Sequence, residues 1–158
     1  MIRTFQYKLY PNQSQIKTLG RWLSTCCWIF NRSLEHRIKA YKRRGESVTY
    51  NDQQGLLTAW RGRIERLKSV PVGFERDALR RVDRGFKAFF RRLKSGQKPG
   101  FPRFKSWRRY KSLEYAAIGN YSSNGRIRIP GLGSICARGR ELPVGKQKML
   151  RVLRRPTG

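Results

Sequence analysis

"FERDALRRVDRGFKAFFRRL", residues 74–93, carries two stripes of side chains at helical spacing. Residues three or four positions apart lie on the same side of an α-helix. The apolar stripe consists of Phe74, Ala78, Val82, Phe86, Phe89 and Leu93. The basic stripe consists of Arg76, Arg80, Arg84, Lys87 and Arg91. The stretch therefore predicts an amphipathic helix that packs on a core along one side and carries five positive charges along another.

Two further helices are predicted before this one. Asn12 and Gln15 form a capping-box pattern, and apolar residues then recur at steps of three and four until a stop near Gly45. Thr49 and Asp52 repeat the capping pattern. The apolar positions behind this second cap are Leu57, Trp60, Ile64 and Leu67. The sequence therefore predicts one long helix and a second helix that continues through its last apolar position.

Short alternating segments lie on both sides of the helical region. Residues 4–10 alternate between apolar and polar side chains, and "GRIRI" at 125–129 does the same, which is typical of half-buried strands. The order of strand, helices, loop and strands predicts an α+β fold in which a small antiparallel sheet or barrel is interrupted by three helices. We expect the strands in residues 1–11 and 95–158, and the inserted helices in residues 12–94.

The chain is strongly basic. It contains 37 Lys and Arg residues against 9 Asp and Glu residues, a formal net charge of +28 over 158 residues. A folded body with that imbalance repels itself unless a polyanion neutralises it. Nucleic acid is the common cellular polyanion, so the composition indicates a DNA- or RNA-binding protein, with a ribosomal type among the alternatives. No run of 18 apolar residues occurs, so we expect no membrane partner.

The reactive side chains form no catalytic or metal-binding pattern. The cysteines Cys26, Cys27 and Cys136 include no C-x-x-C pair, and His36 is the single histidine. The nine acidic residues form no tight cluster of the kind that a two-metal nuclease needs. An odd number of cysteines fits a reducing cytoplasm. We therefore expect no catalytic residue, no metal site and no cofactor in this chain.

The basic stripe has two interpretations. It could be an ordinary solvated helix face, or it could contact a phosphate backbone. Only Asp77 and Asp83 lie near enough along the helix to relieve the repulsion among the five cations. Because the whole chain has an excess of basic over acidic residues, the interpretation as a phosphate-binding face is favoured.

A second basic segment, "KPGFPRFKSW" at residues 98–107, combines three aromatic residues with two prolines. The prolines lower the entropy that is lost when the segment is ordered. Its rings could stack on bases, or Phe101 and Phe104 could pack into the core while only the cations contact nucleic acid. We favour the second interpretation, because exposed rings at this density would form a large apolar patch.

Six motifs occur along the chain in a specific order. They are "YKLYPNQSQ", "NRSLEHRIKAYK", "TYNDQ", "VDRGFKAFFRRLKSG", "GFPRFKSW" and "GRIRIPGLG". Each is weak by itself, but the ordered set resembles the N-terminal part of the TnpB/OrfB family, which is encoded by bacterial insertion sequences. The resemblance extends over essentially the whole chain. Members are RNA-guided nucleases, and older descriptions call them transposases with a helix-turn-helix DNA-binding region.

This resemblance implies a wedge-type β-barrel that is interrupted by a helical recognition domain. In the family these parts hold a guide RNA and read a short motif beside a double-stranded DNA target, so the implied partners are guide RNA and duplex DNA in a bacterial or archaeal cytoplasm, at the nucleoid when bound. Relatives continue into a RuvC-like nuclease domain with three catalytic acids. This chain ends at "RRPTG", about where that domain would begin, so we expect no enzyme activity from it. A nuclease half supplied by a separate chain is one alternative.

The resemblance also implies particular contacts. Tyr50, in "TYNDQ", matches a tyrosine that approaches the motif beside the target, and Arg76 falls where a polar residue reads that motif. The cations of "GFPRFKS" match a region that contacts RNA or the heteroduplex backbone. The predicted nucleic-acid-binding residues are Tyr50, Arg76, Arg80, Arg84, Lys87, Arg91, Arg103, Lys105, Arg108 and Arg109. The competing hypothesis is a helix-turn-helix DNA-binding domain of a transposase that acts without RNA.

Overall fold

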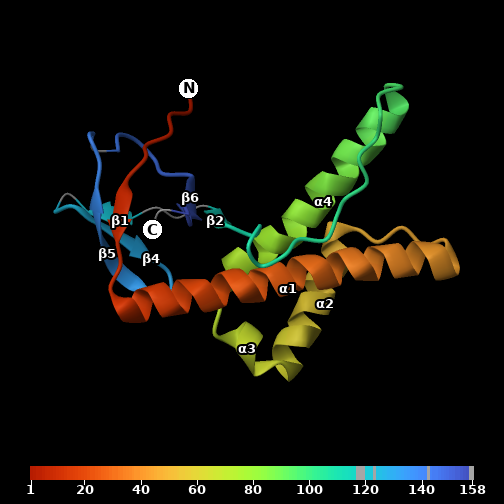
Figure 1. Ribbon diagram of the computed structural model, residues 1–158, viewed down its shortest axis with the longest axis horizontal. Helices are drawn as coiled ribbons and strands as arrows, with labels where there is room; N and C mark the ends of the chain where they lie inside the picture. The colour runs from red at the N-terminus through yellow and green to blue at the C-terminus, as the bar shows by residue number, and fades with distance from the viewer. Residues whose placement is uncertain (117–119, 123, 142, 157–158) are drawn as a thin grey trace.

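The computed structural model describes residues 1–116, 120–122, 124–141 and 143–156 (Figure 1). Within these residues the helices are α1 (Gln13–Arg44), α2 (Tyr50–Arg63), α3 (Glu65–Lys68) and α4 (Val72–Lys94). The strands are β1 (Lys8–Tyr10), β2 (Ser112–Ala116), β3 (Asn120–Ser122), β4 (Arg126–Ile129), β5 (Gly133–Arg138) and β6 (Met149–Leu153). The predicted α+β class and the predicted order of strand, helices and strands are confirmed.

Both predicted capping boxes begin a helix. The Asn12 side chain accepts a hydrogen bond from the Gln15 backbone N–H at 2.8 Å, and the Gln15 side chain accepts one from the Asn12 N–H at 3.0 Å. The Thr49 hydroxyl and the Asp52 carboxylate make the same exchange at the start of α2. Helix α1 ends where Gly45 adopts a φ of 65°, in the left-handed region that glycine enters without strain.

The second helix is shorter than predicted. Helix α2 ends at Arg63, and Ile64 has extended backbone angles (φ −112°, ψ 105°) before the single turn of α3. The break brings Leu67 and Val70 into the core, where their carbonyl groups accept hydrogen bonds from Arg61 at 2.9 and 3.0 Å. The prediction that one helix continues through Leu67 is therefore wrong.

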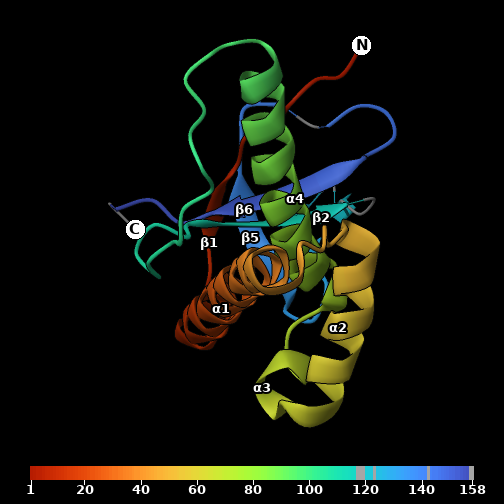
Figure 2. The same cartoon turned by 90° about the vertical axis from the view of Figure 1, so that its right-hand side faces the viewer.

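The hydrophobic core lies where α1, α4 and the strands meet. Helices α1 and α4 cross, and α4 and the α2–α3 segment leave α1 in different directions (Figures 1 and 2). The Phe74 ring lies 5.5 Å from the Trp22 ring and 5.1 Å from the Tyr115 ring of β2. Ile127, Ile129 and Ile135 of the sheet belong to the same buried cluster. Helices and strands therefore share one core. Each fully buried side chain of this kind contributes about 1.5–3 kcal/mol to stability.

Strand β2 approaches α4 at a glycine. A Cβ atom at Gly73 would overlap the ring of Tyr115. Position 73 therefore lacks a side chain because the strand and the first turn of α4 lie against each other.

The strands form two antiparallel sheets. The larger has the order β1-β5-β4-β3, and β2 pairs with β6. Opposite residues include Leu9 and Ala137 in the first sheet and Leu113 and Val152 in the second. In β4 the isoleucines are buried and the arginines are exposed, which confirms the predicted alternation.

The predicted closed barrel is wrong for the part of the chain that the structure describes. Closure requires every strand to pair on both sides. Strands β1 and β3 are edges of the larger sheet, and β2 and β6 pair only with each other. Strand β2 packs against α4 instead of continuing the larger sheet, so small antiparallel sheets are present without closure.

A buried arginine joins the three long helices. The Nε of Arg37 in α1 donates to Oε1 of Gln53 in α2 at 2.9 Å, and its Nη2 donates to Oδ1 of Asp83 in α4 at 3.1 Å. Gln53 in turn donates to the Ser33 carbonyl oxygen at 2.8 Å. This network holds polar groups of α1, α2 and α4 together inside the protein.

A second polar contact lies beneath the α2–α3 corner. Glu75, in the first turn of α4, is completely buried and forms an ion pair with Arg61. Burial raises the pKa of Glu75 to about 7, and the Arg61 guanidinium opposes part of that rise. The Glu75 carboxyl therefore keeps its proton up to a higher pH in the folded chain than in the unfolded chain.

Replacing Glu75 by glutamine is expected to remove part of the pH dependence of folding. The carboxyl contributes its full stabilisation below its unfolded pKa of about 4.5, and this is lost as pH rises through its folded pKa of about 7. Urea unfolding from pH 5 to 8 should show the unmodified chain losing roughly 2 kcal/mol more than the variant. Other groups, including His36, titrate in both proteins, so only the difference between the two pH profiles reports on Glu75. If the two profiles ran parallel, the raised pKa of Glu75 would be contradicted.

Candidate nucleic-acid interface

The basic stripe lies along α4, and its members differ in exposure. Arg76, Arg84, Lys87 and Arg91 are exposed, and Arg80 is half-buried. The C-terminal half of α4 extends away from α1, with the following loop running back beside it (Figure 1). The helix therefore presents its cations over a length that continues beyond the core.

Acidic residues neutralise only part of this stripe. Arg84 lies 3.0 Å from Asp77 and 3.5 Å from Glu114, and Lys87 lies 2.8 Å from Asp83. Each of these acids also pairs with another arginine: Arg81, Arg151 or Arg37. Among the described residues, no acidic group pairs with Arg76, Arg80 or Arg91. A polyanion could therefore occupy the stripe without first displacing a partner of these three cations.

The pKa values of two of the shared acids are shifted in opposite directions. Burial pushes the pKa of Asp83 upward, but hydrogen bonds from Lys87 and Arg37 outweigh it and leave the pKa below its usual value. Burial raises the pKa of Asp77, and the Arg81 guanidinium opposes this rise. The lowered pKa of Asp83 favours the ionised carboxylate that pairs with Lys87.

Tyr50 lies beside the stripe. It is the first residue of α2, immediately after the Thr49 cap, and it is half-buried. The Arg80 guanidinium carbon lies 5.7 Å from the centre of its ring, which is cation–π distance. Arg76 is one helical turn earlier on α4. The structure thus brings together two predicted site residues, Tyr50 and Arg80, from two helices.

The loop after α4 is attached at two places. Near its start, Phe101 packs edge-on against Phe86 and Phe89, with ring centres 5.7 and 5.3 Å apart. Further along, the Asn31 side chain donates to the Lys105 carbonyl oxygen at 2.7 Å and accepts from the Lys105 N–H at 2.9 Å. The loop is therefore held against α4 and α1.

The predicted cations of this loop do not all face outward. Arg103, Arg108 and Arg109 are exposed. Lys105 is half-buried, with its ammonium nitrogen 4.9 Å from the centre of the Phe30 ring, and burial lowers its pKa. Lys105 is thus turned toward the core, away from the exposed cations of the loop.

The aromatic residues of the loop also separate into two groups. Tyr110 is buried, and Phe101 packs on α4 while remaining half exposed. Phe101 is 48% exposed, Phe104 is 56% exposed and Trp107 is 58% exposed, so the favoured packing of Phe101 and Phe104 into the core is wrong. The guanidinium carbon of Arg108 lies 5.4 Å from the centre of the Trp107 ring. The rings of Phe30 and Tyr110 already lie beside the Lys105 ammonium nitrogen, and Phe104 and Trp107 remain at the surface.

A further group of cations was not among the predicted residues. The outer face of the larger sheet carries four exposed cations, Lys8, Arg126, Arg128 and Arg138. The Tyr10 ring lies beside two of them. The guanidinium carbon of Arg138 lies 5.2 Å from the centre of the Tyr10 ring, and the ammonium nitrogen of Lys8 lies 5.5 Å from it. The alternation in "RIRI" could have indicated this group of cations, because every second residue of a half-buried strand faces solvent.

In the described ranges there is no group of three or more His, Cys, Asp or Glu side chains that could hold a metal ion. No helix in the same ranges combines the length and the apolar character that a membrane crossing requires.

Comparison with known proteins finds similarity to one family. Residues 1–46 match the helix-turn-helix domain of OrfB proteins of the IS605 type. A "Putative RNA-guided DNA endonuclease" of Streptomyces pristinaespiralis is 28% identical to this chain over 133 residues, which cover 80% of the chain and 31% of the relative.

A second bacterial relative gives the same result. The "Putative RNA-guided DNA endonuclease InsQ" of Escherichia coli K12 is 26% identical over 135 residues, covering 84% of the chain and 32% of that protein. The chain thus spans about a third of the length of the curated relatives that it matches.

Proposed function

We propose that this chain is the nucleic-acid-binding part of a TnpB-like protein, which holds a guide RNA and helps to recognise the motif that flanks a duplex DNA target. The observation that carries the proposal is the basic stripe of α4, in which Arg76, Arg80 and Arg91 have no acidic partner among the described residues. The names of the two relatives support a guide RNA as one partner. The proposal assigns binding, and not cleavage, to these residues.

The contacts divide into two kinds. Tyr50, Arg76 and Arg80 are grouped at the start of α2 and on α4, where they would face the flanking motif. Arg84, Lys87, Arg91 and the exposed loop cations Arg103, Arg108 and Arg109 would contact phosphates. Phosphate contacts set position without carrying sequence information, and pairing with the guide would supply most of the specificity. In this scheme residues 12–94 form the recognition region, and residues 1–11 and 95–158 form the wedge-like region.

An RNA-independent DNA-binding domain is the second candidate. It is favoured by the match of residues 1–46 to a helix-turn-helix domain, because such domains read duplex DNA directly. Treating the purified protein with RNase or DNase separates the two candidates: loss of co-purified polymer with RNase supports the guide-RNA proposal, and loss with DNase alone supports the alternative.

Binding by the stripe predicts a strong salt dependence. The dissociation constants for duplex DNA and for RNA, measured by fluorescence anisotropy between 50 and 300 mM salt, should follow a straight line on a log–log plot. On duplex DNA the logarithm of the association constant, the reciprocal of the dissociation constant, should fall against log salt with a slope of about −0.9 for every phosphate that the protein neutralises. An affinity that does not change with salt would contradict phosphate binding and with it the proposed function.

A further inference from the structure

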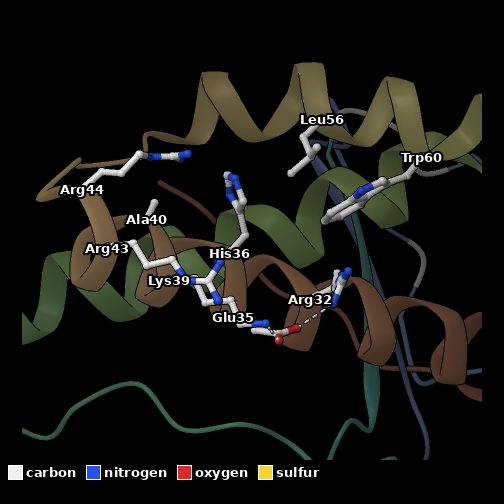
Figure 3. Close-up of a pocket in the computed structure, with 9 residues that line it drawn as sticks. All are labelled: Arg32, Glu35, His36, Lys39, Ala40, Arg43, Arg44, Leu56 and Trp60. Atoms are coloured by element: carbon white, nitrogen blue, oxygen red, sulfur yellow. Dashed lines mark hydrogen bonds and ion pairs between the residues drawn. The ribbon is translucent and has the colours of Figure 1, made fainter.

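A hollow of about 360 Å³ opens between the C-terminal half of α1 and α2 (Figure 3). None of its lining residues belongs to α4 or to the loop that follows it. Its size falls within the range of about 300–1,000 Å³ that holds small organic ligands. It is therefore separate from the basic stripe and from the predicted site residues.

The rim of this hollow is basic. Four of the lining residues are Arg or Lys, and Glu35 is the single acid among them. Glu35 is already held by Arg32 at 2.8 Å and by Lys39. Arg43 is exposed and has no acidic partner within the described part of the chain. The rim thus retains positive charge that a phosphate could neutralise.

One wall is flat and apolar. Leu56 and Trp60 of α2 face the His36 side chain, which rises from α1 (Figure 3). The Trp60 ring is held by an edge-on contact with Trp28, with ring centres 5.6 Å apart. A fixed indole face is a surface on which a nucleobase can stack.

His36 is the lining residue that can exchange hydrogen bonds through a ring. Its Nδ1 atom is buried and has no hydrogen-bond partner among the described residues. Burial, with Arg44, Arg37 and Arg32, lowers the pKa of this imidazole and so favours its neutral form. A neutral imidazole presents one donor and one acceptor, as does the edge of a nucleobase.

We propose that this hollow binds an unpaired nucleotide, with its base between His36 and Trp60 and its phosphate at Arg43 on the rim. An inorganic anion would leave the apolar wall unused, and an apolar ligand would leave the cations unused. A base inside a duplex cannot enter, so the nucleotide is free or belongs to a single strand. Binding of a nucleotide within a single strand rests on the proposed function, whereas binding of a free nucleotide does not.

His36 is the only histidine of the chain, so its imidazole signals in an NMR spectrum are unambiguous. The full chain is titrated with adenosine 5′-monophosphate, with a six-residue oligoadenylate and with inorganic phosphate. We expect a saturable shift of the His36 signals with both nucleotide probes and none with phosphate at the same concentration. Arg43→Gln should weaken the nucleotide about tenfold, as the loss of one charge-assisted contact implies.

The matched control is Lys17→Gln, which removes one exposed charge from the other end of α1 and should leave the affinity unchanged. If the oligoadenylate binds by anisotropy but neither nucleotide probe shifts His36, the inference is overturned while the proposed function stands. If the monophosphate shifts His36 and no oligonucleotide binds, the site is supported and the proposed function fails. Equal shifts with inorganic phosphate would overturn the nucleotide assignment.

Discussion

Replacing Arg76, Arg80 and Arg91 together by alanine is expected to weaken the binding of duplex DNA and RNA by at least about a hundredfold at physiological salt. These are the three stripe cations without an acidic partner among the described residues, so their charge is available to a phosphate backbone. The slope of log affinity against log salt should become shallower by roughly one for each cation removed. Alanine maintains the helix, and thermal unfolding checks that the variant is folded.

The control for this prediction carries the same change in net charge. Lys17, Lys42 and Arg63 are exposed on α1 and α2 and have no acidic partner in the ranges that the structure describes. Their joint replacement by alanine should change the affinity only a few-fold, since they lie off the stripe. Equal losses in the two triple variants would mean that affinity follows total charge and that α4 has no special part in binding.

Replacing Arg37 by methionine is expected to destabilise the folded chain by about 3 kcal/mol. The change leaves the buried Gln53 carbonyl oxygen without its donor and deprives Asp83 of one of its two cations. Methionine fills most of the space, so the loss reports polar groups and not a cavity. Urea unfolding followed by circular dichroism measures the change in free energy.

Arg32→Met serves as the comparison, because its partner Glu35 lies at the surface and such pairs contribute less than about 1 kcal/mol. If both variants unfold at the same urea concentration, Arg37 does not stabilise the junction of the three helices.

Local patterns made much of the helical part predictable. The capping boxes at Asn12 and Thr49 and the glycine at 45 mark ends that depend on residues only a few positions apart. The stripe on α4 is likewise a matter of spacing within one helix. The break at Ile64 could not be predicted, since it follows from the burial of Leu67 and Val70 by distant helices.

The sheets and the loop depended on distant contacts. Strand β1 pairs with β5 across most of the chain, so neither the pairing nor the absence of closure follows from alternation. Lys105 is turned inward because its backbone is bonded to Asn31, which is 74 positions away. The cations on the sheet face had a local signal, but no adjacent motif pointed to a role for them.

The double attachment of the loop after α4 has a consequence for the kinetics of recognition. Since the Phe101 ring and the backbone of Lys105 are already held in the unliganded chain, the backbone that carries the neighbouring arginines keeps its position relative to the helix. The entropy of ordering this backbone is lost during folding and not at the moment of encounter. Under the proposed function, a strand arriving from solution would meet a loop whose backbone is already ordered, and association would need no slow rearrangement of that loop.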